Sequence, residues 1–428
     1  MKKISFLIAT ASLLIPLGSC QNDMEDGSLD SGNEMTTEWE PKKTPYMAIP
    51  LDTRAAEAVT SNNDFAIRFL SEICRDEQLK GQNITVSPFS VYTVLAILAN
   101  ADQGTASEEI INALTGNGKV ISIEDINAYC EEMIEWLPKV DGTCNVSTAN
   151  SIWTDKKYSL NPFTEKTISS VFSAEFFNNY SLASEDARLA INKWCEQKTS
   201  GKIPELLTSR LDDGMGAFIA NTLYFRGCWK DQFNKYLNEE GDFFKNDGTK
   251  SNVTYMHQEM TVAFSNTNEY VYVSLPYGNG NYCMNLIVPK DMDIYAFVDK
   301  FSADDYSAAK LGREARKFEF AMPKFTANTD VNCNSYLEAM GVKDVFSTGL
   351  SSLLSGWIAP INTIAHVANI SVDEEGTEGA AVTYSPAFGE LNLEKGILTI
   401  DSPFLYFIEE TSTGTILFEG IVADPSSK

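Results

Sequence analysis

The sequence predicts an α+β fold, with helices mainly in the first part of the chain and strands mainly in the second. Before residue 200, apolar residues recur every three or four positions in several segments, which is the helical period. After residue 217, short apolar or alternating runs flank turn sequences, as in antiparallel hairpins. This order of elements is typical of α+β proteins with large, mostly antiparallel sheets.

The N-terminus reads as an export signal. Two lysines precede the apolar run 4–17, which leads into LGSC at Cys20, a pattern that resembles a bacterial lipobox. We expect residues 1–19 to be a signal peptide and Cys20 to be acylated, which holds the protein in the cell envelope, at the outer membrane or cell surface. A plain signal peptide or a membrane anchor are the alternatives, although the run is short for an anchor. Whether the protein faces the periplasm or the exterior stays open.

Residues 20–57 read as an acidic tether that is expected to be disordered, because they are polar, contain several prolines and lack periodic apolar positions. The folded domain is predicted to span 58–428, and we expect a monomer. The formal charge is −26, and no Lys/Arg cluster is visible. This charge opposes nucleic acid as a partner and makes activation by heparin unexpected.

The elements of the domain follow in order. A helix begins near Ala58, because Phe65, Phe69 and Ile73 recur every four residues. A short strand at 83–86 precedes Pro88, which opens the next helix. Further helices are predicted at 108–114 and 187–198, an almost continuous apolar run at 217–226, an alternating run at 317–322, and hairpins at 270–288 and 404–422.

Sequence motifs of common enzyme classes are missing. The chain has two histidines, His257 and His366, and neither GxSxG nor HExxH occurs. The seven cysteines after Cys20 have wide, irregular spacings, so they read as small core residues, although a single disulfide stays open. We therefore predict no metal, no cofactor and no enzymatic activity, with a carboxylate-based hydrolase as a distant alternative.

Seven segments resemble, in this order, those of the serpin family. They are NITVSPFS (83–90), GT followed by EEI (104–110), NVSTANSIW (145–153), INKW followed by TSGKI (191–203), NTLYFRGCW (221–229), PKF (323–325) and DSPF (401–404). The resemblance covers about residue 58 to the end. It implies one domain with three β-sheets, eight or nine helices and an exposed reactive-centre loop at about 374–397.

The resemblance also implies a function. Serpins offer this loop to a protease, and the cut loop inserts as a new strand into the largest sheet while the protease is held as an acyl-enzyme. The expected partners are serine proteases, with cysteine proteases as a second class. The alternative is a non-inhibitory binding protein on the same scaffold, whose loop is only a protease substrate.

The loop has the pattern that insertion needs. Positions of one parity are all small, which suits the buried face of an inserted strand. These positions are Thr377, Gly379, Ala381, Thr383, Ser385, Ala387 and Gly389. The family's hinge pattern matches Glu374, Gly376, Thr377, Gly379, Ala380 and Ala381. Two departures are Gly379, where alanine is usual, and Pro386, which lacks a backbone donor and would interrupt the last part of the new ladder.

The reactive bond is expected at Glu390–Leu391, from the usual distance to Glu374. Counting back from Pro403 gives a site near Asn392 instead, and Phe388 would suit a chymotrypsin-like protease. The resemblance also assigns residues that control the conformation. Ser87, Ser90, Asn221 and His366 fall at the family's shutter, the polar cluster beneath the opening sheet, and Trp229 falls at the breach, where the loop first enters the sheet.

Overall fold

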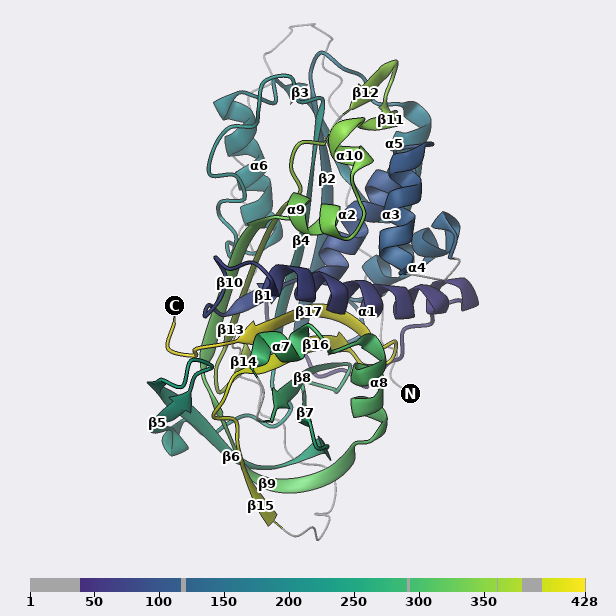
Figure 1. Ribbon diagram of the computed structural model, residues 1–428. Helices are drawn as coiled ribbons and strands as arrows, with labels where there is room; N and C mark the ends of the chain where they lie inside the picture. The colour runs from purple at the N-terminus through teal and green to yellow at the C-terminus, as the bar shows by residue number, and fades with distance from the viewer. Residues whose placement is uncertain (1–38, 117–120, 291–292, 360, 379–394, 428) are drawn as a thin grey trace, which may run out of the picture. The chain divides into compact units, whose positions relative to one another are not determined.

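The computed structural model describes residues 39–116, 121–290, 293–359, 361–378 and 395–427 (Figure 1). Glu40 to Lys428 form one unit. Its described residues contain the helices α1 (Thr53–Cys74), α2 (Pro88–Asn100), α3 (Thr105–Thr115), α4 (Ile123–Trp136), α5 (Pro162–Phe172), α6 (Glu185–Lys198), α7 (Ile294–Val298), α8 (Ala303–Leu311), α9 (Asn334–Ala339) and α10 (Asp344–Ser347), and the 3₁₀ turn η1 (Lys235–Leu237). The described residues thus contain ten α-helices, whereas the family resemblance implied eight or nine. Three of the ten, α7, α9 and α10, have only four to six residues each.

The largest sheet has nine strands. They are β1 (Ile84–Val86), β5 (Glu239–Phe244), β6 (Lys250–Asn266), β7 (Tyr270–Pro276), β8 (Tyr282–Pro289), β9 (Glu314–Pro323), β15 (Lys395–Thr399), β16 (Phe404–Glu410) and β17 (Thr415–Val422). Their order is β1-β17-β16-β8-β7-β6-β9-β15, and β5 pairs with β6. The two hairpins predicted from the sequence are confirmed as the antiparallel pairs β7–β8 and β16–β17.

The second sheet has six strands and carries the candidate site. They are β2 (Cys144–Asp155), β3 (Glu175–Tyr180), β4 (Ala217–Cys228), β10 (Phe325–Asn332), β13 (Ala365–Val372) and β14 (Gly376–Thr377). The order is β10-β13-β14-β4-β2-β3. The third sheet is the pair β11 (Leu350–Leu354) and β12 (Trp357–Ala359). Three sheets in a mixed α+β unit agree with the predicted fold class.

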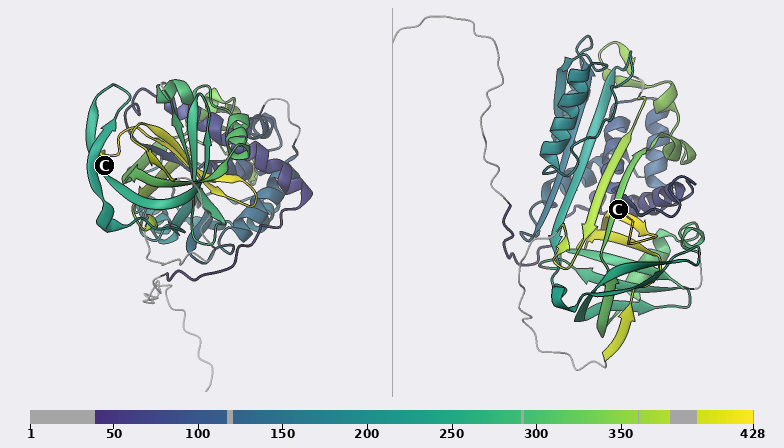
Figure 2. Two further views of the ribbon diagram at one scale, coloured as in Figure 1. Left: turned by 90° about the horizontal axis from the view of Figure 1, so that it is seen from below. Right: turned by 90° about the vertical axis from the view of Figure 1, so that its left-hand side faces the viewer.

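The six-stranded sheet has two different faces, because side chains alternate along each strand. On β4, Ile219 and Leu223 join the main core on the face that α2 covers, which we call the inner face. Phe218 and Ala220 point the other way and pack with Trp194 of α6 in a second cluster, on the outer face. Figure 2 shows the strands of this sheet running side by side.

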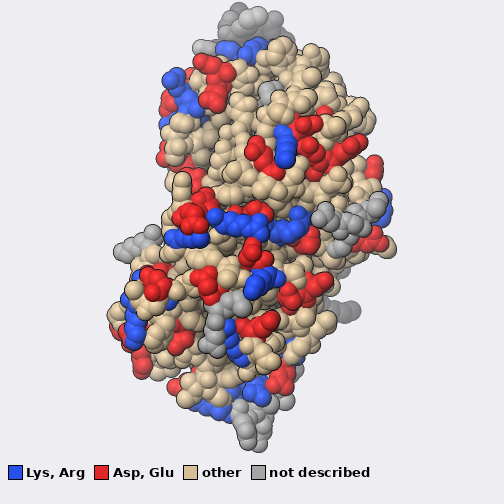
Figure 3. All heavy atoms as spheres, viewed as in Figure 1, with Lys and Arg blue, Asp and Glu red and all other residues tan. Residues whose placement is uncertain are grey.

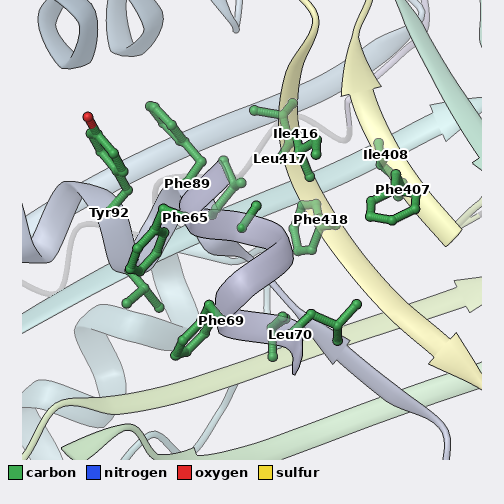
Figure 4. Close-up of a cluster of buried hydrophobic side chains, with 14 of the residues drawn as sticks. Phe65, Phe69, Leu70, Phe89, Tyr92, Phe407, Ile408, Ile416, Leu417 and Phe418 are labelled. Carbon is green, nitrogen blue, oxygen red and sulfur yellow. The ribbon is translucent and has the colours of Figure 1, made fainter. Parts of the chain in front are cut away.

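The main core lies between α1, α2 and the hairpin β16–β17 (Figure 4). The rings of Phe65 and Phe69 on α1 stack with centroids 5.5 Å apart, and the Tyr92 ring of α2 meets Phe65 edge-on. Leu417 and Phe418 of β17 are buried in the same core. The apolar residues whose four-residue spacing predicted α1 therefore form the face of the helix that contacts these elements. None of the described helices combines the length and apolarity needed to span a bilayer.

The packed part of the chain begins before the predicted start near residue 58. The Lys42 N–H donates to the Gly142 carbonyl at 2.7 Å, and Met47 exchanges two hydrogen bonds with the Asn281 side chain. Asp52 then caps α1 by accepting hydrogen bonds from the first backbone N–H groups of the helix. Residues 42–52, which the sequence placed in the tether, thus pack against the domain.

Candidate functional site

The predicted hinge forms a short strand within the six-stranded sheet. The expectation that the loop belongs to the largest sheet is therefore wrong in this respect, because the largest described sheet has nine strands and does not contain the hinge. Strand β14 lies between β13 and β4, with Thr377 opposite Val372 on one side and Gly227 on the other. Gly376 has a φ of 153°, and a Cβ there would lie 1.9 Å from the Gly227 carbonyl oxygen. Only glycine fits this close approach of two backbones. The first residues of the predicted loop are thus already paired on both edges.

Beyond β14, the strands on either side are separate from each other. In the described part of the sheet, β13 pairs with β10 and β14, while β4 pairs with β2 and β14. No described ladder joins β13 directly to β4. Each of these strands therefore has an edge along which a further strand could add backbone hydrogen bonds.

The predicted breach residue, Trp229, contacts the hinge directly. Its indole N–H donates to the Asp373 carbonyl at 2.8 Å, and its backbone N–H donates to the Glu375 carbonyl at 2.9 Å. The Tyr277 ring stacks on Trp229 with centroids 4.4 Å apart. The Tyr277 hydroxyl lies 2.5 Å from the hydroxyl of Thr377, a residue with no exposed surface. Sequence reasoning missed Tyr277, which lies between the end of β7 and the GNGN turn and forms an isolated β-bridge with Trp229.

Glu374 is a buried carboxylate at the base of the hinge. The Lys324 ammonium lies 3.0 Å from it, and the Asn238 side chain donates to it. Burial raises the pKa of the Glu374 carboxyl, but the hydrogen bond from Asn238 and the charge of Lys324 outweigh burial, so that the net shift is downward. Lys324 belongs to the PKF motif, so the lysine of this motif supplies the positive charge that faces Glu374 in the hinge.

The four predicted shutter residues lie together beneath the sheet. The Ser87 N–H donates to Nε2 of His366 at 3.0 Å, and the Ser90 N–H donates to the Ser87 hydroxyl at 3.2 Å. The Ser90 hydroxyl donates to the Asn221 side chain, whose amide donates to Asn150 Oδ1 at 2.6 Å. Asn150 had no predicted role, although it lies in the NVSTANSIW motif. The cluster links α2, β2, β4 and β13.

His366 is held in its neutral form. Its Nε2 accepts a hydrogen bond, which a protonated imidazole could not do. Burial lowers its pKa from the ordinary 6.5 to about 4. Proton uptake would therefore break the bond to Ser87.

This pKa predicts a loss of stability in mild acid. The imidazole of the unfolded chain takes up its proton near pH 6.5, whereas the folded one resists until about pH 4. The stability that His366 contributes is complete above pH 6.5 and falls as the pH drops to about 4, by about 3 kcal/mol. The thermal midpoint of the unchanged protein should fall more steeply over this range than that of His366→Gln, which cannot titrate. Parallel curves for the two proteins would contradict the assignment.

The remaining predicted site residues lie outside the described residues. They are the lipidation site Cys20, the hinge residues Gly379, Ala380 and Ala381, and the reactive-bond candidates Phe388, Glu390, Leu391 and Asn392.

The cysteines in the described residues are poor candidates for a nucleophile. All seven cysteines there are buried and outside disulfides, and burial raises the thiol pKa of Cys195 and Cys283 to about 12. A thiol with so high a pKa is a poor nucleophile at neutral pH. Within the same residues, no group of three His, Cys, Asp or Glu side chains is placed to hold a metal ion.

Comparisons with known proteins agree on one family. A family described as "Serpin (serine protease inhibitor)" matches residues 60–425. Human leukocyte elastase inhibitor is 28% identical over 383 residues, covering 86% of this chain and 99% of the relative. An uncharacterised serpin-like protein of Methanosarcina mazei is 27% identical over 384 residues, covering 88% and 89%.

Solved structures share the fold. The thermophilic serpin tengpin in its native state has a TM-score of 0.77 at 23% identity, covering 90% of this chain and 97% of that one. Human thyroxine-binding globulin has a TM-score of 0.79 at 22% identity, covering 88% and 100%. At these identities the likeness concerns the fold alone.

Proposed function

The chain belongs to the serpin family, and we propose that it is an irreversible suicide-substrate inhibitor of serine proteases. In the proposed reaction, the protease serine oxygen forms an ester with the carbonyl carbon of Glu390. The peptide bond to Leu391 breaks, and Leu391 leaves with a free amine. The loop then inserts into the six-stranded sheet before water can hydrolyse the ester. On this proposal the protein is not an enzyme.

The observation that carries the proposal is the docked hinge. Strand β14 pairs on both edges, and the strands beside it have no described ladder with each other. A loop that continued from Thr377 would gain hydrogen bonds to β13 and β4 at once. Its first buried side chain, Thr377, already points to the inner face, where it meets Tyr277.

The register of β14 supports the small-residue pattern. Continued by one residue per step, it would place position 383 opposite both His366 and Asn221. Both of these residues belong to the shutter, on the inner face. All inner positions from 377 to 389 carry small residues, so insertion would avoid the cost of overpacking, about 1–3 kcal/mol per site.

The same register limits the effect of Pro386. Strand β13 begins at Ala365, which would pair with position 384. Position 386 would face only β4, opposite Phe218. The missing N–H of proline would therefore affect one edge at the end of the inserted strand.

The location and partners are further parts of the proposal. We infer a lipid-anchored protein of the cell envelope, acylated at Cys20, that protects the envelope from serine proteases and acts as a monomer. Heparin is not an expected activator, because cations on the face in Figure 3 lie beside acids. Arg68 and Arg75 of α1, for example, pair with Asp64 and Glu72.

A denaturing gel tests the proposed function. The protein without residues 1–20 is mixed with glutamyl-specific, chymotrypsin-like, elastase-like and subtilisin-like proteases. We expect a covalent complex with at least one of them, and a released C-terminal peptide that begins at Leu391. A peptide that begins at Gly389 or Leu393 would move the reactive bond to Phe388 or Asn392.

The second candidate is a non-inhibitory binding protein. Thyroxine-binding globulin, a structural neighbour, carries a binding function in its name on the same fold. Cleavage in the loop by every protease, with all of them still active and no complex formed, would favour this candidate.

A further inference from the structure

Glu378 ends the docked part of the hinge in an uncommon conformation. Its N–H donates to the Ser371 carbonyl at 2.9 Å, so pairing with β13 reaches this residue. Its φ of 54° lies in the left-handed region, which residues with a side chain rarely adopt without support from their surroundings. Thr377 points to the inner face, so the Glu378 side chain lies on the outer face, where it is only 3% exposed.

Lys202 is the cation beside this buried carboxylate. Its ammonium lies 3.4 Å from Oε2 of Glu378, and its side chain is about half exposed. Burial raises the pKa of the Glu378 carboxyl, while the charge of Lys202 and a hydrogen bond from Tyr224 act in the opposite direction. Without Lys202, the carboxylate would keep the hydrogen bond from Tyr224 and the charge of Arg226 but lose the largest compensation for its burial, so that its exposure to water should become more favourable.

The turn after α6 fixes the position of Lys202. Ser200 and Gly201 both have positive φ, and the Lys202 N–H donates to the Thr199 carbonyl at 3.0 Å. The Thr199 hydroxyl accepts from the N–H of Ile203, whose side chain is buried in the outer cluster. These residues are the TSGKI motif, for which the sequence offered no role.

We propose that Lys202 is a positioning residue that keeps Glu378, and with it the start of the reactive loop, docked between β13 and β4 before a protease binds. This inference rests on the proposed function for its consequence. An inserted strand that is already started needs less chain ordering to continue. Trapping would then compete better with hydrolysis of the acyl-enzyme.

Hydrogen exchange on the full-length protein tests the docking itself. In Lys202→Met, the amides of the hinge peptide that contains residues 376–378 should exchange about tenfold faster, because the docked strand opens more often. Lys202→Arg keeps the charge and should exchange like the unchanged protein. The matched control is Lys198→Met, which removes a nearby lysine that pairs with Glu175 instead. Unchanged hinge exchange in Lys202→Met would overturn the proposal.

A protease titration tests the consequence. With a protease that the unchanged protein traps, Lys202→Met should need about threefold more inhibitor per protease, while the rate of loop cleavage stays the same. An unchanged requirement would show that docking does not assist trapping. If the unchanged protein trapped no protease, the proposed function would fail, and hinge exchange would still decide whether Lys202 docks the loop.

Discussion

Thr377→Arg is expected to be cut and released by a protease that the unchanged protein traps. Thr377 has no exposed surface, and its hydroxyl lies 2.5 Å from that of Tyr277. A guanidinium at this position would have to enter the core without a partner, which costs several kcal/mol. The amount of inhibitor consumed per protease should therefore rise about tenfold or more, since each 1.4 kcal/mol of slower insertion shifts the competition tenfold.

Two measurements separate a failed insertion from a failed fold. Thr377→Ser keeps the hydroxyl beside Tyr277 and should trap the protease within about twofold of the unchanged protein. The thermal midpoint of uncut Thr377→Arg should stay near that of the unchanged protein, because β14 has only two residues and β13 and β4 would keep their ladders with β10 and β2 if it left the sheet. A stable one-to-one complex formed by Thr377→Arg would rule out insertion through this position.

Local patterns in the sequence were sufficient for several elements. Pro88 predicts the start of α2, because proline suits the first turn of a helix, and it lies there in the structure, where Ser87 caps the helix. The GNGN turn between two apolar runs predicts the β7–β8 hairpin. The resemblance supplied what such patterns could not, namely that Ser90 of α2 and Asn221 of β4 meet.

The missed features depend on partners that are distant in the chain. Residues 42–52 have no apolar period that would predict packing. Backbone and polar hydrogen bonds to Gly142 and Asn281 hold them to the domain instead. Strand β6, 17 residues long, pairs with β5, β7 and β9 along different parts of its length, so no single alternation describes it. Helix α4 did carry a local signal, the capping box at Ser122, which the sequence analysis passed over.

The contact between Lys202 and Glu378 shows the same limit at the site. Either residue alone reads as a surface charge in the sequence, and surface ion pairs contribute little. Only the fold reveals that the carboxylate is buried on the outer face and that the turn after α6 brings the lysine to it. An ion pair that depends on burial could therefore not be predicted from the sequence, whereas the small residues of the loop could be recognised there.

A matched pair of substitutions should show which face of the loop enters the core. Position 383 would lie on the inner face between His366 and Asn221, and position 382 would lie on the outer face. Thr383→Tyr adds a ring where the shutter is already packed, so insertion should stall there. Val382→Tyr adds the same ring on the face where the sequence already carries Tyr384.

The expected results differ although both variants gain a tyrosine in the same loop. Overpacking by about 1–3 kcal/mol should raise the inhibitor consumed per protease by about fivefold or more in Thr383→Tyr. Val382→Tyr should stay within about threefold of the unchanged protein, because its ring would lie on the other face. Titration against one protease, with complex and cleaved protein read from the same gel, gives both values. The reverse order of effects would mean that the loop inserts out of the register that β14 sets, since a shift by one residue exchanges the two faces.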